Sequence, residues 1–390
     1  MIPSRPAVGE RRSWLGLMSG TSCDGIDAVR LTLEEAESGP RRIECRGGTI
    51  PFEPDFARAL REVLVEGGSA AECARWDARL GERFAAAARH AIEERGPVDG
   101  IALSGHTFAH LSAESPRSTL QLGSPAIVAE RTGRPVLGGF RAMDVARGGE
   151  GAPLVPAGDR VLFGALGARV AVINIGGISN VTWLVRGEEP QAIDCGPGNL
   201  VLDAVHRAAR PDGEGFDRGG CLALRGRVDA DWLARVGEPA LRAAGGGDGA
   251  RRTFGREEFG EAFARSAAGD LDRLPLEDRL ATLAAWITGA IAAALARLAG
   301  ADPPDRVLIG GGGAANEALR AGLQESLGVE IEPLQREVHG VSADLREAAA
   351  FATLCHEWVC GRPGSFPGTS GAAAVPGLGS WTLPCGPLPR

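Results

Sequence analysis

The sequence predicts an α/β protein made of two similar domains, and three observations support this. Its 390 residues exceed the length that one hydrophobic core usually serves. A strand–turn–strand pattern occurs twice, around residues 20–27 and again around residues 176–180. A third glycine-rich turn, residues 310–316, follows an apolar strand and precedes a helix. Because ligands usually bind in clefts, a ligand site between the two domains is expected.

The N-terminal half begins to fold at residues 14–18, a short apolar run typical of a buried strand. A turn of small residues separates this run from residues 26–31, whose alternation of apolar and polar residues predicts a second strand. Helical segments are expected next over residues 55–66 and 72–94. The sequence therefore predicts a hairpin that opens the first domain and is followed by helices.

The second half repeats this order. Residues 170–175 and 181–185 read as strands on either side of a glycine turn, and a helix is expected over 199–210. The later elements are a buried helix over 280–298, a strand over 306–309, helices over 317–327 and 344–358, and a glycine- and proline-rich tail with at most one strand. Asn316 or the loop before it is expected to cap the helix at 317–327.

Composition excludes several classes of protein. The net charge of -8 and the pI near 5.5 argue against binding to a nucleic-acid backbone. The chain contains no lysine, which a Walker A loop, a pyridoxal phosphate enzyme and a protein kinase all require. Eight scattered cysteines without a CxxC pair and an N-terminus without an apolar signal stretch fit a cytoplasmic protein that has no membrane segment.

The first hairpin turn carries groups that can bind phosphate. Backbone amides and the hydroxyls of Thr21 and Ser22 can donate to phosphate oxygens, while Asp24 or Asp27 can hold a hydrated magnesium ion. Taken alone, such a hairpin is more often an ordinary turn, and the same alternative applies to the turn at Gly176. The run of four glycines at 310–313 favours the close approach of a nucleotide more strongly.

Asp194 ends a short apolar stretch and precedes a rigid Gly-Pro-Gly turn that starts a helix. A carboxylate held there could act as a general base toward a water molecule or a hydroxyl group. The alternative is that it caps the helix or forms an Asx turn.

For several other polar residues the sequence leaves both a functional and a structural interpretation open. His106 and His110 are four residues apart, but Gly105 makes a helix doubtful, so a zinc site ranks low. Arg141 and Asp144 could form a structural ion pair before a domain crossover. Glu347 lies on a predicted helix and could simply face solvent.

The order of the three glycine-rich turns is that of the actin, hexokinase and Hsp70 superfamily, in which ATP lies between two similar domains. The predicted fold is therefore α/β, with two actin-like (ribonuclease H-like) domains around an interdomain ATP cleft. Residues 1–153, joined by the tail 361–390, are expected to form the N-terminal domain, and residues 154–360 the C-terminal domain.

From residue 14 to residue 381 the sequence resembles the anhydro-N-acetylmuramic acid kinases of bacterial cell-wall recycling. So many matches in the same order are highly specific. The matching segments are 16–29, 119–123, 129–133, 140–141 with Asp144, 148–156, 174–180, Asp194 with 196–199, Asp217 with 219–220, 255–257, 311–313 with Asn316, and 347–348 with 351–352.

The resemblance implies an ATP- and Mg2+-dependent enzyme that hydrolytically opens the 1,6-anhydro ring of the sugar and phosphorylates its O6, giving N-acetylmuramate 6-phosphate and ADP. It implies that Asp194 takes the proton of the attacking water, and it suggests a homodimer. The residues expected at ATP are Gly20, Thr21, Ser22, Cys23, Asp24 (also the metal ligand), Gly25, Ile26, Asp27, Gly176, Gly177, Gly311, Gly312, Gly313 and Asn316, and those expected at the sugar are Thr107, His110, Arg141, Gly196, Asn199 and Glu347.

The chain departs from the family's usual pattern at four positions. Ser104 and His106 replace the histidine and glutamine of His-Gly-Gln-Thr-x-x-His, Gly139 replaces an aspartate, and Cys195 replaces a threonine. These changes leave a kinase of a related sugar as an alternative. A non-catalytic actin-like nucleotide-binding protein is a second alternative, against which the retained Asp194 argues. A glycosidase that needs no ATP is a third, weakened because only one well-placed carboxylate is found.

Overall fold

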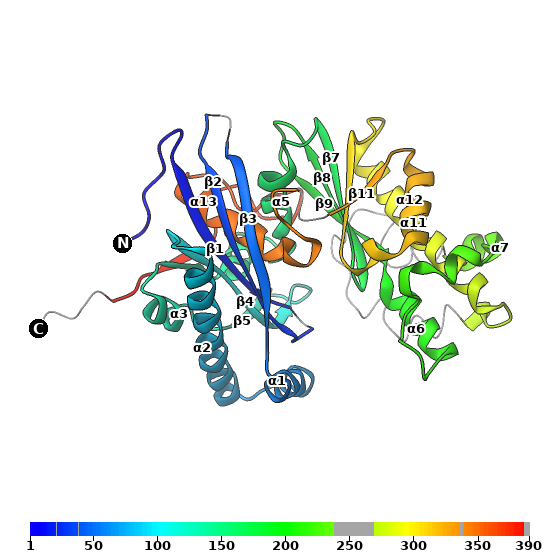
Figure 1. Ribbon diagram of the computed structural model, residues 1–390, viewed down its shortest axis with the longest axis horizontal. Helices are drawn as coiled ribbons and strands as arrows, with labels where there is room; N and C mark the ends of the chain where they lie inside the picture. Colours follow the sequence, from blue (N-terminus) through cyan, green and yellow to red (C-terminus); the bar gives the residue numbers. More distant parts are fainter. Residues whose placement is uncertain (21, 38, 238–268, 335–337, 386–390) are drawn as a thin grey trace, which may run out of the picture. The chain divides into compact units, whose positions relative to one another are not determined.

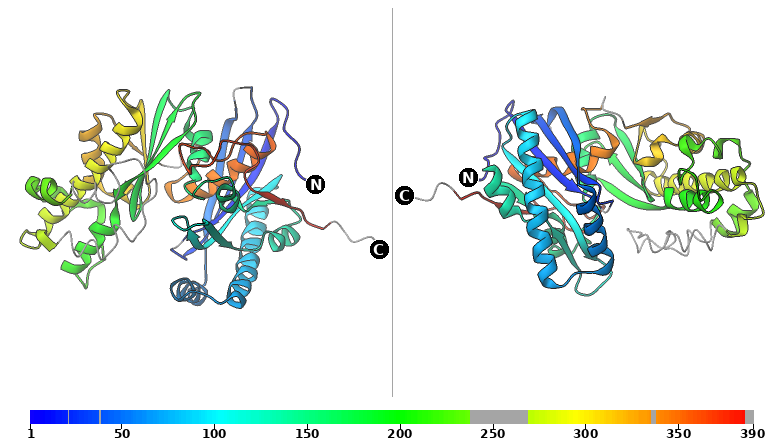
Figure 2. Two further views of the ribbon diagram at one scale, coloured as in Figure 1. Left: turned by 180° about the vertical axis from the view of Figure 1, so that it is seen from behind. Right: turned by 60° about the horizontal axis from the view of Figure 1, so that its bottom comes forward.

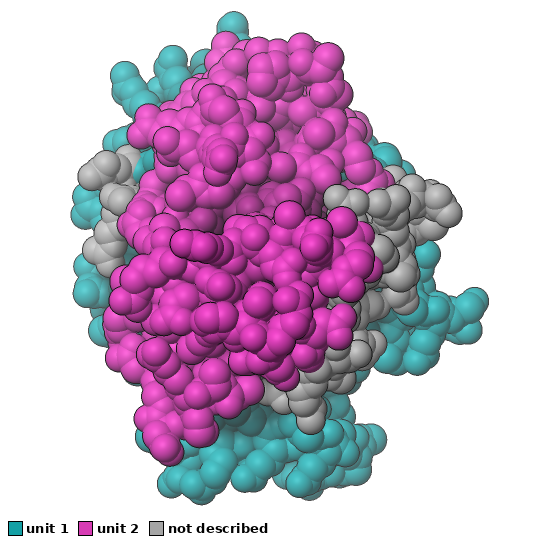
Figure 3. Space-filling view, turned by 90° about the vertical axis from the view of Figure 1, so that its right-hand side faces the viewer, with its two compact units in different colours: residues 1–162, 335–390 teal, residues 163–334 magenta. Residues whose placement is uncertain are grey.

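The computed structural model describes residues 1–20, 22–37, 39–237, 269–334 and 338–385, and the chain divides into two compact units (Figures 1 and 3). The first unit comprises Met1–Leu162 and Gln335–Arg390, and the second comprises Phe163–Leu334. The sequence analysis assigned residues 154–360 to the second domain. The two divisions therefore differ in the placement of 154–162 and 335–360.

The first unit contains one mixed sheet and its covering helices. Its strands are β1 (Arg11–Ser19), β2 (Gly25–Glu34), β3 (Arg41–Pro51), β4 (Gly100–Leu111), β5 (Ser118–Leu122), β6 (Val136–Gly138) and β12 (Ser380–Thr382). Its helices are α1 (Pro54–Glu66), α2 (Ala70–Arg95), α3 (Pro125–Thr132), α4 (Phe140–Ala146), α5 (Val155–Phe163, ending at the boundary of the unit), η7 (Ala343–Leu345) and α13 (Arg346–Val359). The strand order is β12-β6-β4-β1-β2-β3, with β5 paired to β4.

Alternation along β1 explains how helices cover both faces of this sheet (Figure 2). Leu15 and Leu17 are fully buried in the core that α1 and α2 complete. The intervening Gly16 faces α13, where an added Cβ would lie 1.9 Å from the carbonyl oxygen of Ala348. Only glycine therefore lets α13 lie this close to β1, and this packing places the late segment of the chain in the first unit.

The second unit repeats the plan of the first. Its strands are β7 (Arg169–Ile175), β8 (Ile178–Val185), β9 (Gln191–Pro197), β10 (Arg306–Gly310) and β11 (Ile331–Pro333). Its helices are α6 (Asn199–Ala209), α7 (Ala230–Trp232), α11 (Leu276–Ala299) and α12 (Glu317–Leu327), with short helical turns η1 (Arg218–Gly220), η2 (Ala223–Arg225), η3 (Leu233–Gly237), η5 (Gly269–Leu271) and η6 (Gly312–Ala315). The strand order is β11-β10-β7-β8-β9.

Both sheets contain the same five-stranded arrangement. An antiparallel meander, β1–β3 or β7–β9, is followed by a strand parallel to the first strand of the meander and by another strand parallel to that one. The predicted α/β fold with two actin-like, ribonuclease H-like domains is thereby confirmed.

Helix α11 shows why the apolar run in the second half is not evidence for a membrane segment. It is long and apolar enough to cross a bilayer, with a mean hydropathy of 1.5, but 67% of that apolar window is buried within the protein. Leu280, Leu283 and Ile287 are fully buried in the core of the second unit. The prediction of a buried helix here is confirmed.

Candidate active site

The turn between β1 and β2 begins at Gly20 and is anchored by one buried side chain. Cys23 adopts a left-handed φ of 53°, and its side chain is fully buried in the core of the first unit. The hydroxyl of Ser22 donates to the carboxylate of Asp24 over 2.9 Å, and the side chain of Arg61 donates to the carbonyl oxygen of Ser22. Ser22 and Asp24 are exposed, so their side chains are available to a ligand. The buried side chain of Cys23 anchors the turn in the core.

A buried serine joins the two ends of this turn, and a buried histidine supports that serine. The hydroxyl of Ser19 donates to the carbonyl oxygen of Gly25 over 2.9 Å, and Nδ1 of His106 lies 3.1 Å from the same hydroxyl oxygen. Because the single hydroxyl proton is already donated, His106 is assigned as the donor through Nδ1–H. Burial lowers the pKa of His106 to about 4, so the imidazole is neutral at physiological pH.

Four carboxylates gather near the start of β2. Asp27 accepts a hydrogen bond of 2.5 Å from the hydroxyl of Thr49 on the neighbouring strand β3. Burial raises the pKa of Asp27 to about 6; the hydrogen bond opposes this shift, and the charges of Asp24, Glu347 and Asp344 add to it. Mg2+ prefers carboxylate oxygens and would offset this repulsion, so Asp27 and Asp24 have the chemistry to hold a divalent cation, although among the described residues the four carboxylates do not converge into one ligand group.

Three of the residues predicted for the sugar are neighbours within the first unit. Arg141 donates from Nη1 to the carbonyl oxygen of Gly151 over 3.0 Å, and its positive charge interacts favourably with Glu347. A Cβ added at Gly151 would lie 3.1 Å from Cε1 of His110. Burial, followed by the charge of Arg141, lowers the pKa of His110. Glu347 is half-buried, so it does not lie on a fully solvated face.

Asp144 supports the same loop instead of pairing with Arg141. Its fully buried carboxylate accepts one hydrogen bond of 2.8 Å from the amide of Gly151 and another of 2.7 Å from the hydroxyl of Ser370. Arg141 and Asp144 therefore bind the carbonyl and the amide of one glycine. The ion pair that the sequence allowed between them is not formed among the described residues, because Arg141 binds a loop carbonyl while Asp144 binds a loop amide and the Ser370 hydroxyl.

In the second unit three loops meet where β7 ends. A Cβ at Gly311 would lie 2.5 Å from the carbonyl oxygen of Ile175, and one at Gly313 would lie 2.5 Å from the Cβ of Ile175. Asn199 donates its amide proton to the carbonyl oxygen of Gly176 over 2.8 Å, and its side-chain Nδ2 donates to that of Ile175 over 3.3 Å. The structure thus brings the predicted glycines of β7–β8 and β10–η6 together around Asn199.

The remaining residues of this group have definite local roles. Gly312 lies beside Asn199, since a Cβ there would be 3.3 Å from Nδ2. Gly177 packs against the side chain of Leu200. The Oδ1 atom of Asn316 accepts hydrogen bonds from the first turn of α12, which confirms the predicted cap.

Asp194 lies next to a bulge near the end of β9. It pairs with Asn180 in the register of β8 and β9, and the register shift that follows leaves Cys195 unpaired before Gly196. Asp194 is 8% exposed, while Cys195 packs into the hydrophobic core. Gly198 occupies the N-cap position of α6, so Asp194 does not cap that helix. The bulge therefore lets the side chains of Asp194 and Cys195 occupy different environments.

The low ranking of a zinc site at His106 and His110 agrees with the structure. Both residues lie on strand β4, where residues four apart are separated by about 13 Å along the chain. One metal ion cannot be bound by both at that separation.

The structure places the predicted residues in both units. The β1–β2 turn, Thr107, His110, Arg141 and Glu347 belong to the first unit; the glycines at 176–177 and 311–313, Asp194, Gly196, Asn199 and Asn316 belong to the second. Within the turn, the side chain of Ile26 is buried in the core, so only its backbone is available to a ligand. Thr21 and the segment 255–257 lie outside the described residues.

The sequence did not identify two of the residues that lie near these carboxylates. Thr49 lies opposite Asp27 on β3, and Asp344 lies in η7 just before α13. Strand pairing between β2 and β3 could have identified Thr49, but the strand at 41–51 was not predicted.

Comparison with known proteins gives one consistent family. A family model described as anhydro-N-acetylmuramic acid kinase matches residues 12–384. A protein of that name from Salinibacter ruber is 36% identical over 404 aligned positions, covering 96% of this chain and 97% of its own length. One from Xanthomonas campestris is 38% identical over 390 positions, covering 97% and 99%, and one from Pseudomonas paraeruginosa is 36% identical over 372 positions, covering 94% and 98%.

Solved structures give weaker matches. An activator of the 2-hydroxyisocaproyl-CoA dehydratase from Clostridium difficile with bound ADPNP matches 89% of this chain and 95% of that chain, with a TM-score of 0.39 and 11% identity. A ROK family glucokinase from Streptomyces griseus in complex with glucose and AMPPNP matches 87% and 99%, with a TM-score of 0.35 and 17% identity. The fold assignment rests on the order and direction of the strands in each unit, not on these matches.

Proposed function

The chain belongs to the anhydro-N-acetylmuramic acid kinase family, and we propose that it uses water to open the 1,6-anhydro ring of anhydro-N-acetylmuramic acid and uses ATP to phosphorylate O6. The products are N-acetylmuramate 6-phosphate and ADP, in the recycling of peptidoglycan. The observation that carries the proposal is the family match over residues 12–384, which includes both glycine-rich hairpins and the carboxylate of Asp194.

Asp194 is the proposed general base. It accepts a proton from a water molecule while the water oxygen forms a bond to the anomeric carbon and the bond from that carbon to O6 breaks. The released O6 then attacks the γ-phosphorus of ATP, and ADP leaves with the electron pair of the broken bond. Support comes from the low exposure of Asp194 and from the bulge that sets its position at the end of β9.

The phosphates of ATP are proposed to bind to backbone amides of the glycine-rich turns. Since the chain has no lysine, charge on the phosphates must be neutralised by other groups. Mg2+ would supply that neutralisation when bound. Asp27 and Asp24 are the proposed carboxylates for the metal; Asp27 is the stronger candidate because three other carboxylates lie near it, and their charges add to the rise in its pKa that burial causes.

The sugar is proposed to contact Thr107, His110, Arg141, Glu347, Gly196 and Asn199. The substituted positions give little reason to prefer a different sugar. His106 and Cys195 are buried and make internal contacts, and Gly139 adopts a left-handed φ of 70° as the N-cap of α4. Two of the four changes therefore affect internal packing and a third affects backbone conformation, which favours the family's own substrate over the related sugar.

We also propose a cytoplasmic homodimer without a nucleic-acid or membrane partner. The family resemblance supports the dimer, and the net charge of -8 disfavours binding to nucleic acid.

The test is ADP release by the full chain with ATP, Mg2+ and anhydro-N-acetylmuramic acid, compared with reactions lacking the sugar. We expect release only with the sugar, and a loss of about 10²–10⁴-fold in kcat for Asp194→Asn. Asp212→Asn, which alters an exposed carboxylate after α6, is the matched control and should retain full activity. ADP release with another sugar but not with this one would overturn the proposed substrate. Wild-type activity of the Asp194→Asn variant would overturn the assignment of Asp194 as the general base.

A further inference from the structure

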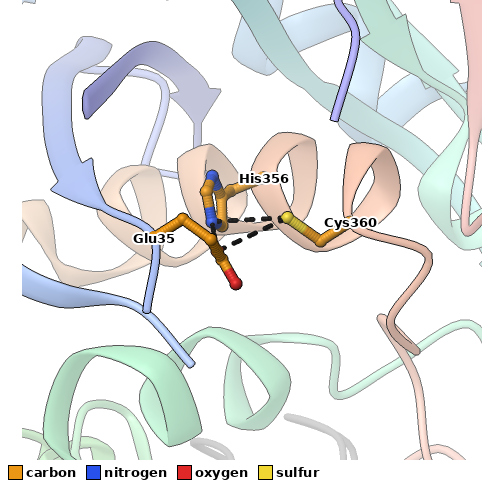
Figure 4. A group of neighbouring side chains, drawn as sticks. All are labelled: Glu35, His356 and Cys360. Atoms are coloured by element: carbon orange, nitrogen blue, oxygen red, sulfur yellow. Dashed lines mark hydrogen bonds and ion pairs between the residues drawn. The ribbon is translucent and has the colours of Figure 1, made fainter. Parts of the chain in front are cut away.

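A buried cluster in the first unit combines three kinds of metal-binding side chain (Figure 4). Glu35 follows β2, His356 lies in the last turn of α13, and Cys360 follows that helix. These residues are 4%, 0% and 5% exposed. The cluster lies outside the groups proposed for ATP and for the sugar, and nothing in the proposed reaction uses it.

The ligating atoms lie close together. Nε2 of His356 is 2.6 Å from Oε2 of Glu35, and Sγ of Cys360 is 3.5 Å from each of these two atoms. Zinc bonds of about 2.0–2.3 Å in tetrahedral geometry separate neighbouring ligand atoms by about 3.3–3.6 Å. The two sulfur distances already match this requirement, while the oxygen–nitrogen pair, held by a hydrogen bond, must open by about 0.7 Å.

We propose that Glu35, His356 and Cys360 form a structural zinc site. A carboxylate, an imidazole and a thiolate are all established zinc ligands, and a water molecule would complete a tetrahedral set. On binding, the metal replaces the hydrogen bond between His356 and Glu35. The imidazole proton moves from Nε2 to Nδ1, which leaves a buried N–H without a partner among the described residues and opposes binding. The thiol proton of Cys360 is released to solvent.

Arg362 also opposes a cation here, and its contacts show how its charge is balanced. It donates to both carboxylate oxygens of Glu35, over 2.8 and 3.1 Å, and to Glu357 over 2.8 Å. Glu357 is also paired with Arg160. Each oxygen of Glu35 has two lone pairs, so Oε2 can accept from Arg362 and still bind a metal. In that arrangement Arg362 orients the ligating carboxylate from outside the metal's coordination sphere.

The position of the cluster indicates a structural role. His356 lies nine residues after Glu347 on α13, which is about 13 Å along the helix axis. The site would join the end of β2 to a segment more than three hundred residues later in the chain. Metal binding would stabilise this contact between the two segments. It would not contribute a group to phosphoryl transfer.

The experiment measures the zinc content of the full chain, expressed in zinc-supplemented medium and purified without a histidine tag. We expect about one zinc per chain in the wild type and at least a tenfold lower content in Cys360→Ala, with the same loss in Glu35→Gln. Cys355→Ala is the matched control, because Cys355 is a buried thiol on the same helix outside the cluster and should leave the zinc content unchanged.

Replacement of the metal by Co2+ provides a second measurement that does not depend on the variants folding. Bound Co2+ should give a thiolate-to-cobalt charge-transfer band in the wild type. Zinc below about a tenth of an ion per chain without a cobalt band, or full zinc content in a folded Cys360→Ala variant, would overturn the proposal.

Discussion

Nδ1 of His106 lies 3.1 Å from Oγ of Ser19, and that oxygen in turn donates its proton to the carbonyl of Gly25. The Ser19 hydroxyl therefore links the two strand ends that frame the proposed phosphate turn, and one buried side chain from β4 holds that hydroxyl in place. Because burial keeps the imidazole neutral, this support does not change across the physiological pH range.

Replacing His106 should weaken the turn more than it weakens the fold. We expect His106→Ala to raise the KM for ATP and to destabilise the protein by about 1–3 kcal/mol, because a buried hydroxyl loses its donor. His106→Gln can still donate to Ser19 and should recover most of the KM. Steady-state kinetics and chemical denaturation measure both effects. The exposed His90→Ala is the control, and an unchanged KM in His106→Ala would refute the role.

The raised pKa of Asp27 predicts an unusual pH dependence. Its folded-state pKa of about 6 exceeds the ordinary 3.8, so the folded state binds the proton more tightly than the unfolded state. The charged carboxylate therefore costs stability above pH 6, and that cost disappears as the pH falls toward 4. Asp27→Asn should have a higher Tm than the wild type at pH 7.5, and the difference should shrink at pH 4.5.

Two further measurements test the assignment of Asp27. Mg2+ should raise the Tm of the wild type more than that of Asp27→Asn, because the metal offsets the repulsion among the carboxylates. The exposed Asp302→Asn should show neither effect. A Tm difference between Asp27→Asn and the wild type that stays constant from pH 4.5 to 7.5 would contradict the assignment.

The ion pair between Asp159 and Arg346 is buried and joins α5 to α13. Asp159→Asn should destabilise the protein by about 3–5 kcal/mol, because it leaves the guanidinium buried without its counter-charge. The pair between Arg58 and Asp55 is exposed, so Arg58→Ala should cost less than about 1 kcal/mol. Urea denaturation measures both values. Equal losses of stability would show that burial does not make the pair between Asp159 and Arg346 more important than an exposed pair.

Two glycine substitutions should have opposite effects. Gly16→Ala places a Cβ 1.9 Å from the carbonyl oxygen of Ala348 and should displace α13, with loss of soluble protein or of cooperative unfolding. Gly289→Ala lies within α11 with open space around it and should stabilise the protein by about 0.5–1 kcal/mol. Thermal unfolding compares the two. A Gly16→Ala variant as stable as the wild type would mean that α13 does not lie on β1 as described.

The sequence alone determined the duplicated hairpins, the glycine turns and most of the helices. These features are local: the alternation in residues 26–31 and the apolar run at 280–298 each follow from a side-chain period within one segment. Asn316 was identified as a helix cap for the same reason, since its hydrogen bonds reach only two and three residues ahead. The aspartate at 194 was selected by its place between an apolar stretch and a rigid turn.

Only the tertiary structure decided which distant segments meet. No local pattern indicates that α13 packs on Gly16, that Asp144 supports Gly151 and Ser370, or that Glu35 meets His356 across the chain. A strand's alternation shows which residues share a face but not what covers that face. For that reason the burial of His106 and Cys195, which gives their substitutions a structural meaning, could not be predicted from the sequence.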